Sequence, residues 1–247
     1  MNRYKTLRNY CGNKIEYYSP APKTTIAIGI PCIPKHEKHL KDLFKTIKNQ
    51  TTPSREVIIG ISETSKNKAQ KLFKTLQPLI NCPLLITFTT KKAFAGENRN
   101  RIAKHSTSTL ISFVDADDLM HPQRNEILLD TYNKKHPKSM VHQFTMNSKD
   151  MTKTFHTPEV KDGKYLHSLA KNKKEQASPL YAPNLHHGHI TTETKLFKKI
   201  KQPEHRRRAQ DTSFVGRILD AYPNDPKAMN FIKAPLTQYR IQYSSAN

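Results

Sequence analysis

Three carboxylates stand within four residues in the run Asp115-Ala116-Asp117-Asp118. Carboxylates this close repel one another, so a fold keeps them together where a cation or a sugar hydroxyl compensates their charge. Hard oxygen ligands at this spacing suit a divalent ion that also binds phosphate oxygens. The alternative is a helix N-cap, because an aspartate at a strand-to-helix turn stabilises the dipole of the next helix. That alternative accounts for one aspartate, or for two.

The elements before this run predict how it is positioned. Short β-branched runs alternate with segments whose apolar residues recur at helical spacing. The expected strands cover residues 24–30, 56–61, 83–88 and 109–114, and the expected helices cover 36–50, 69–79 and 96–105. This alternation predicts an α/β fold with a mostly parallel sheet and helices on both faces. Ligands bind at the carboxyl ends of such strands, which here are residues 31–33, 62–63 and 115–118.

The second half is less regular. We expect a helix over 124–134, a strand over 140–144 and a lysine-rich loop or lid over 147–177. Regular structure is expected again over 180–190 and 196–200. A helix is expected over 211–222, and the tail 236–240 is expected to end the fold. No internal repeat is present.

The ordered series of motifs resembles the family 2 glycosyltransferases, inverting enzymes of the GT-A fold that use nucleotide-diphosphate sugars. The most specific match is Phe113–Asp118, with Pro122 and Arg124 after it, which is close to the family's F-L-D-A-D-D-x-x-x-P-x-R. The run 31–34 resembles the P-x-Y-N that follows the first strand, and 96–100 resembles an A-R-N segment. Residues 1–23 show no clear period and are expected to form an N-terminal extension. The resemblance implies one GT-A domain over 24–247. That domain has a nucleotide-sugar half (24–122) and an acceptor half (123–247).

The resemblance assigns roles on the nucleotide side by position. Pro31 and Ile33 would line the base pocket. Glu63 takes the place of an acidic residue that hydrogen-bonds a uracil-type ring edge. Arg99 would face the nucleotide, since its forked guanidinium suits a base or a diphosphate. A UDP-sugar is therefore the favoured donor, and a glycan, a protein or a lipid would be the acceptor.

The resemblance also assigns the acidic residues. Asp115 and Asp117 would hold the ribose and the sugar. Asp117 or Asp118 would hold a divalent cation, Mn²⁺ or Mg²⁺, which neutralises the diphosphate leaving group. Gln210-Asp211 stands where the family has its acidic pair, which makes Asp211 the general base that deprotonates the acceptor hydroxyl. The alternative for Asp211 is an N-cap of the helix that follows it.

Three departures from the family pattern bear on these roles. Ser62-Glu63-Thr64-Ser65 has lost both aspartates of the family's D-D-G-S, and Gln242 stands where many relatives carry a histidine near the metal. The sequence contains no Trp, so the Q-x-x-R-W motif of processive synthases is missing. This favours addition of a single sugar over polymerisation.

Two further segments are rich in potential ligands. The run His186-His187-Gly188-His189 is expected to form a polar strand that borders the acceptor cleft; only His187 and His189 would share a face there, so only they could hold a metal together. The basic run 195–208 could bind a phosphate-rich acceptor or a lipid surface, and its alternative is a solvated helix and loop.

Composition leaves other function classes open. The chain has 247 residues, of which 42 are Lys or Arg and 20 are Asp or Glu, giving a formal net charge of +22. A nucleic-acid-binding protein would explain this charge but not the acidic run. A nucleotidyltransferase would show a glycine-rich loop after the first strand, where residues 30–34 have no glycine. A transferase that binds its nucleotide without turnover is the remaining alternative.

The sequence also bears on location. We expect no transmembrane segment and no signal peptide, because no run of about 18 apolar residues and no charged-then-apolar leader is present. The three cysteines have no paired spacing, which favours a reducing, cytoplasmic compartment. Peripheral membrane contact through the basic surface stays open.

Overall fold

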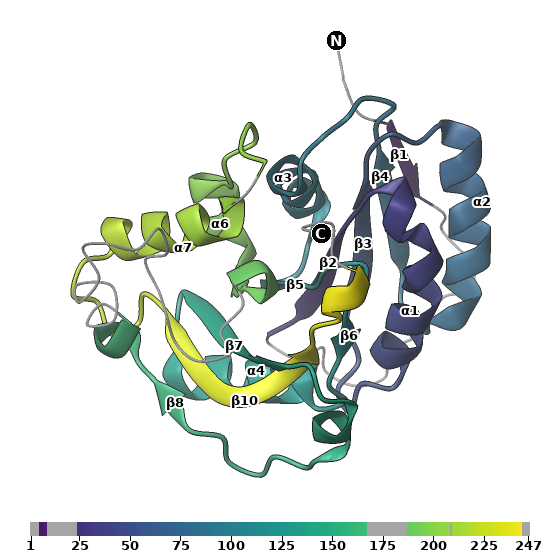
Figure 1. Ribbon diagram of the computed structural model, residues 1–247. Coiled ribbons are helices and arrows are strands. Elements are labelled where there is room, and N and C mark those ends of the chain that lie inside the picture. Colours follow the sequence, from purple (N-terminus) through teal and green to yellow (C-terminus); the bar gives the residue numbers. More distant parts are fainter. Residues whose placement is uncertain (1–4, 9–23, 167–186, 208, 244–247) are drawn as a thin grey trace.

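The computed structural model describes residues 5–8, 24–166, 187–207 and 209–243, and Figure 1 shows them as coloured ribbons. The strands are β1 (Lys5–Arg8), β2 (Ile26–Cys32), β3 (Glu56–Ile61), β4 (Leu84–Phe88), β5 (Leu110–Phe113), β6 (Leu119–Met120), β7 (Ser139–Thr145), β8 (Val160–Lys161), β9 (Thr191–Glu193) and β10 (Asn230–Gln238). The α-helices are α1 (Leu40–Lys48), α2 (Lys66–Leu76), α3 (Ala95–His105), α4 (Arg124–Lys135), α6 (Thr194–Ile200) and α7 (Gln210–Ala221). The 3₁₀ helices are η1 (Pro34–His39), η2 (Gln77–Leu79), η3 (Ser148–Thr152), η4 (His187–His189) and η5 (Ile241–Tyr243).

The strands form one mixed sheet in the order β1-β4-β3-β2-β5-β9-β7-β10-β6, with β8 also paired to β10. The neighbours β4, β3, β2 and β5 are all parallel, and β7 is parallel to β10. The short strand β9 joins these two groups, because it pairs antiparallel with both β5 and β7. The predicted α/β class with a mostly parallel, helix-covered sheet is confirmed.

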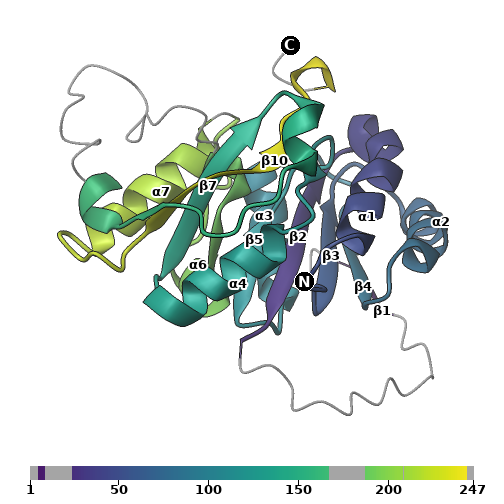
Figure 2. The same cartoon turned by 90° about the horizontal axis from the view of Figure 1, so that it is seen from below.

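Helices cover both faces of the sheet, which explains why its central strands are apolar without alternation. In β3, Val57, Ile59 and Ile61 pack into the apolar cluster shared with α1 and α2, whereas Ile58 belongs to the cluster under α3, α6 and α7. Figure 1 shows α1 and α2 on the side away from α6 and α7. The helix α4 packs with β2, β5, β7 and β10 in a third cluster, and Figure 2 shows it beside these strands.

A close contact fixes α3 on the sheet. A Cβ atom at Gly60 would lie 2.7 Å from the main-chain oxygen of Asn98, nearer than such atoms approach in proteins. Glycine therefore lets the backbone of α3 lie directly on β3. The next residue of α3, Arg99, is held by this contact at the carboxyl ends of the central strands.

Several elements differ from the prediction. Within the expected extension over 1–23, the described residues 5–8 form β1, which pairs antiparallel with β4. The strand expected over the histidine run is wrong: residues 187–189 form η4, and the strand begins at Thr191. The tail expected over 236–240 is the end of β10, a strand that begins at Asn230. The expected loop contains η3 and β8 in its described part, while residues 167–177 and 180–186 lie outside the described residues.

Candidate active site

The acidic run forms a turn at the carboxyl end of β5. The Val114 amide donates to the Gly29 carbonyl at 3.1 Å, which continues the pairing of β5 with β2. The chain then turns, and the Asp118 amide donates to the Asp115 carbonyl at 3.1 Å. This acidic turn, residues 115–118, therefore begins at the sheet edge where the sequence analysis placed the ligand site.

Arg99 holds the first carboxylate of the turn. Its Nη2 donates to Oδ1 of Asp115 at 2.7 Å, and Arg99 is buried while Asp115 is partly exposed. Nη1 of Arg99 lies 3.4 Å from Oε1 of Gln202, its acceptor in the loop after α6. The two residues that the resemblance assigned to the nucleotide, Arg99 and Asp115, thus form one ion pair. A carboxylate fixed in this way is preorganised for a ligand hydroxyl or cation.

Burial and neighbouring charges act on the carboxylate of Asp117. Burial, followed by the negative charges of Asp115 and Asp118, raises the pKa of Asp117 to about 7. On η1, the imidazole of His36 faces this carboxylate, with Nδ1 3.7 Å from Oδ1 of Asp117. Burial lowers the pKa of His36, so the imidazole does not provide a permanent positive charge. Arg240 acts to lower the pKa of Asp117, but burial and the two neighbouring charges prevail, so a bound cation would favour the ionised form of this carboxyl.

Asp118 is buried and accepts from two distant segments. Its Oδ2 lies 2.8 Å from Nε2 of His189, on η4, and its Oδ1 accepts from the Arg240 amide at 2.9 Å. The Arg240 side chain also donates from Nε to the Asp117 carbonyl. Its Nη1 lies 3.5 Å from Oδ2 of Asp42 on α1. The chain after β10 thereby fixes the back of the acidic turn.

Three side chains bring possible metal-ligand atoms together. One ligand atom each from Asp115, Asp118 and His189 lies within 4.8 Å of the others. Two carboxylate oxygens and an imidazole nitrogen suit Mn²⁺, and the carboxylates alone suit Mg²⁺. The donor set therefore fits a divalent cation. Asp118, one of the two ligands predicted from sequence, belongs to this group; Asp117, the other, lies beside it and faces His36.

Arg124, at the start of α4, holds the strand end from which the acidic turn begins. Its guanidinium is fully buried and donates from Nη2 to the Phe113 carbonyl at 2.6 Å and to Oγ of Ser112 at 3.0 Å. Burial lowers its pKa, and the charges of Asp118 and Asp115 act in the opposite direction. The motif therefore links Arg124 to the acidic run in space as well as in sequence: the first residue of α4 donates to the end of β5, immediately before the run.

The three residues expected at the base pocket lie at neighbouring strand ends. Pro31 is buried within β2, and Ile33 follows that strand in a half-buried position. The Ser62 amide donates to the Cys32 carbonyl at 3.3 Å, so the loops after β2 and β3 are adjacent. Glu63 is exposed beside them and has a φ of 56°, a left-handed conformation that is uncommon outside glycine.

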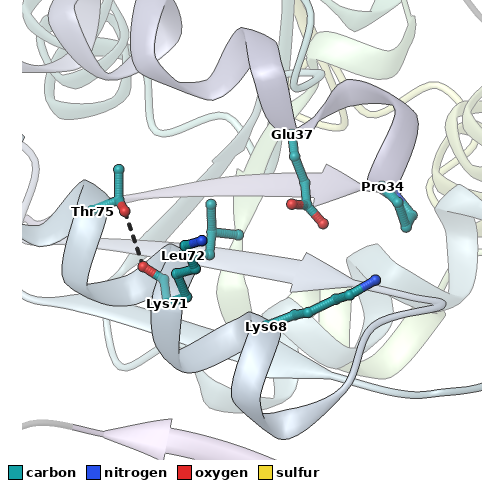
Figure 3. A pocket seen from close by; sticks show the side chains of 6 residues that line it. All are labelled: Pro34, Glu37, Lys68, Lys71, Leu72 and Thr75. Atoms are coloured by element: carbon teal, nitrogen blue, oxygen red, sulfur yellow. Dashed lines mark hydrogen bonds between the residues drawn. The ribbon is translucent and has the colours of Figure 1, made fainter.

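A pocket of about 370 Å³ opens next to these loops, between η1 and α2 (Figure 3). It is lined by Pro34, Glu37, Lys68, Lys71, Leu72 and Thr75. Figure 3 shows the Glu37 carboxylate directed from η1 into the space above α2. None of the acidic-turn residues lines this pocket, so it is separate from the site built by Arg99 and Asp115.

Asp211 lies in the first turn of α7, whose preceding residue Ala209 has a φ of 57°. Its Oδ1 accepts from the Thr212 amide at 2.8 Å, and the residue is half-buried. The helix packs against η4, which carries His189. Asp211 and the acidic turn are thus connected through one short segment.

No sequence motif indicated a site role for His36 or Arg240, and His189 was expected to lie in a polar strand. The signal for His189 was the histidine run itself, but a strand would have divided its side chains between two faces. Arg240 had no signal, because its contacts depend on the path of β10. His36 lies two residues after the 31–34 motif, and this proximity was the available clue.

Together, the sheet order, the helices on both faces and an acidic turn paired with arginine define a GT-A-type fold. Residues 27–200 match the family model for Glycosyl transferase family 2. This match covers well over half of the chain, and the chain therefore belongs to glycosyl transferase family 2. It is a glycosyltransferase, an enzyme that transfers a sugar from a nucleotide sugar.

Individual glycosyltransferases are also similar to this chain, one in sequence and two in fold. An uncharacterized glycosyltransferase of Methanocaldococcus jannaschii is 25% identical over 225 residues, covering 89% of this chain and 71% of that protein. The structure of S. aureus TarS 1–349 in complex with UDP-GlcNAc matches with a TM-score of 0.59 and 16% identity, over 84% of this chain and 56% of that one. The mannosyltransferase PcManGT from Pyrobaculum calidifontis, in complex with GDP-Man and Mn²⁺, matches with a TM-score of 0.54 and 14% identity, over 85% and 57%. The chain thus spans little more than half the length of these two structures.

Proposed function

We propose that the protein transfers a single sugar from a UDP-linked donor to an acceptor hydroxyl, with inversion and with a divalent cation. The observation that carries this proposal is the Arg99–Asp115 ion pair at the edge of an acidic turn in which burial and the neighbouring carboxylates raise the pKa of Asp117. The TarS structure with UDP-GlcNAc and the PcManGT structure with GDP-Man and Mn²⁺ support a nucleotide-sugar donor and a cation in proteins of this fold.

Different residues of the site bind the base, the diphosphate and the cation. Pro31, Ile33 and Glu63 surround the nucleotide base, while Arg99 and Asp115 orient the ribose and the diphosphate. When bound, a divalent cation would neutralise charge that develops on the leaving diphosphate. Asp115, Asp118 and His189 would hold that cation, with Asp117 as a further oxygen donor in place of its contact with His36.

Asp211 is the proposed base on the acceptor side. A carboxylate that accepts the proton of the acceptor hydroxyl makes its oxygen a better nucleophile. Inversion requires this oxygen to attack from the side opposite the diphosphate. Asp211 is half-buried in the first turn of α7, so its carboxylate is partly accessible to an acceptor.

We also propose a reducing, cytoplasmic compartment. The free thiols of Cys32 and Cys82 are consistent with it.

Turnover tests the proposal directly. The protein is incubated with UDP-glucose, UDP-GlcNAc and GDP-mannose in Mn²⁺, and released nucleotide is measured. We expect release from a UDP-sugar that stops when EDTA is added. Release from GDP-mannose alone would contradict the choice of UDP, and equal release in EDTA would contradict the role of the cation.

A further inference from the structure

The end of α6 and the loop after it, residues 199–207, carry several exposed cationic side chains. Lys199, Lys201, Arg206 and Arg207 are exposed, and we call residues 199–207 the basic loop. No ion pair in the described part of the chain includes any of these four side chains, whereas Lys195 earlier in α6 pairs with Glu193. The loop also contains one carboxylate, Glu204, whose Oε1 accepts from Nδ2 of Asn100 at 3.0 Å. The loop therefore keeps a net positive charge, which attracts an anion.

Hydrogen bonds and close packing hold the basic loop on α3. Nδ2 of Asn100 donates to the Gln202 carbonyl at 2.9 Å, and the Gln202 amide donates to Oδ1 of Asn100 at 2.9 Å. A Cβ atom at Gly96 would lie 2.6 Å from the Pro203 main-chain oxygen, so only glycine allows the loop this close to α3. The main chain of the loop is therefore anchored and does not simply extend into solvent.

The loop connects the two functional parts of the site. Oε1 of Gln202 lies 3.4 Å from Nη1 of Arg99, the residue that holds Asp115. At its other end the chain enters α7, where Asp211 lies in the first turn. Figure 1 shows α6 and α7 on the same side of the sheet as α3. The exposed cations thus lie on a segment that contacts Arg99 through Gln202 and continues into the helix that carries Asp211.

Backbone conformation gives the loop a defined shape. Lys201 has a φ of 54° and Ala209 a φ of 57°, both in the left-handed region that residues with a Cβ atom seldom adopt. Such residues persist where the surrounding structure holds them, and they concentrate at ligand sites. One stands near each end of the exposed stretch.

We propose that the basic loop binds a phosphate group of the acceptor, so that the acceptor hydroxyl is presented to Asp211. Arginine forks and lysine ammonium groups are the side chains that recognise phosphate oxygens. This inference rests on the proposed function, because it names the acceptor class of the same site. A phosphate group could belong to a soluble acceptor or to a lipid headgroup. We favour the acceptor because the chain leads from the loop into α7, whose first turn carries Asp211.

Binding of fluorescein-labelled inorganic polyphosphate tests the inference. The titration is done in EDTA and 150 mM salt, where the acidic turn without a cation repels the probe. The double variant Arg206→Gln/Arg207→Gln is compared with Lys41→Gln/Lys74→Gln, which removes two exposed cations from α1 and α2. We expect the loop variant to weaken binding at least tenfold and the control less than twofold. Equal losses in both variants would mean that only net charge matters and would overturn the inference.

A second arm separates the two sources of phosphate. The same proteins are sedimented with phosphatidylglycerol vesicles and with phosphatidylcholine vesicles. If the loop variant loses vesicle binding but keeps wild-type affinity for polyphosphate, the loop binds a membrane surface and the inference is wrong. Wild-type protein that binds UDP in Mn²⁺ but no polyphosphate would overturn this inference alone. Failure to bind UDP would contradict the proposed function instead.

Discussion

The buried carboxylate of Asp118 lies 2.8 Å from Nε2 of His189, although 71 residues separate them in the sequence. Asp118 belongs to the turn after β5, and His189 belongs to η4 immediately before β9. The pair therefore joins the expected nucleotide-sugar half to the expected acceptor half. Arg240, whose amide donates to the other oxygen of Asp118, adds the end of β10 to the same point.

Removal of the imidazole should destabilise the fold. In His189→Ala, Asp118 keeps a buried negative charge without its nearest partner, and breaking a buried pair costs about 3 kcal/mol. We expect that loss in the free energy of unfolding measured with urea. His156→Ala, an exposed histidine, is the control and should stay within about 0.5 kcal/mol of wild type. A His189 variant as stable as the control would show that the pair contributes nothing.

Loss of the Arg240 side chain should weaken nucleotide binding. Its guanidinium donates to the Asp117 carbonyl, lies near Asp42 and covers the Tyr243 ring at 5.1 Å. A hydrogen bond to a charged group is worth about 1.5–3 kcal/mol, which corresponds to at least a tenfold change in affinity. We expect Arg240→Ala to raise the Kd for UDP in Mn²⁺ about tenfold by calorimetry. Arg217→Ala, an exposed arginine on α7, should leave it unchanged; equal affinities in both variants would refute this role.

Asp211→Asn should separate donor binding from transfer. The amide keeps the size of the side chain but cannot accept the proton, and general base catalysis contributes typically 10²–10⁴-fold. We expect UDP release from the UDP-sugar to fall about a hundredfold or more, while calorimetry finds the wild-type Kd for UDP. Asp220→Asn, an exposed carboxylate at the other end of α7, should retain the wild-type rate. Normal turnover in the Asp211 variant would exclude it as the base.

Buried cysteines predict a simple chemical behaviour. Cys32 and Cys82 are free and buried, and burial raises the pKa of Cys82 to about 12 and raises that of Cys32 further. The thiolate reacts, so both side chains should be inert near neutral pH. A Cys11→Ser variant should show no reaction with a thiol reagent at pH 8 in the native state. Two thiols should react after unfolding in urea; rapid reaction of the native protein would contradict the burial of both.

Much of the nucleotide half followed from the sequence because its strands are buried on both faces. The runs around Ile28, Ile58 and Ile86 are apolar without interruption. The first two are followed by helices with an apolar stripe, α1 and α2, whereas α3 buries polar side chains beside Ile102 and Ala103. The acidic turn followed from the same logic, since it stands directly after the next such strand. The pairing of Arg99 with Asp115 was within reach because both were assigned to one ligand.

The acceptor half was harder to predict for physical reasons. In β10, Pro235 cannot donate to a neighbour, and the register to β7 shifts on both sides of it, so the strand lacks a regular pattern. The short strand β9 and the helix η4 are defined by contacts with β5, β7 and Asp118, not by local spacing. Contacts of this kind connect residues that are far apart in the sequence. Such residues carry no pattern that single-sequence reasoning can read.

No helix in the described residues is long and apolar enough to cross a membrane. Peripheral contact through the basic loop is a separate matter, and the vesicle experiment addresses it.

The account depends most on the claim that the acidic turn and Arg99 form a nucleotide site completed by a cation. Its most direct test is the melting temperature of the wild-type protein with UDP, GDP and dTDP, each in Mn²⁺, in Mg²⁺ and in EDTA. A ligand that binds only the folded state stabilises it by about 2.7 kcal/mol at a hundredfold excess over Kd. We predict a rise in melting temperature with UDP and a divalent cation that disappears in EDTA. An unchanged melting temperature with every nucleotide, or the same rise in EDTA, would contradict the claim.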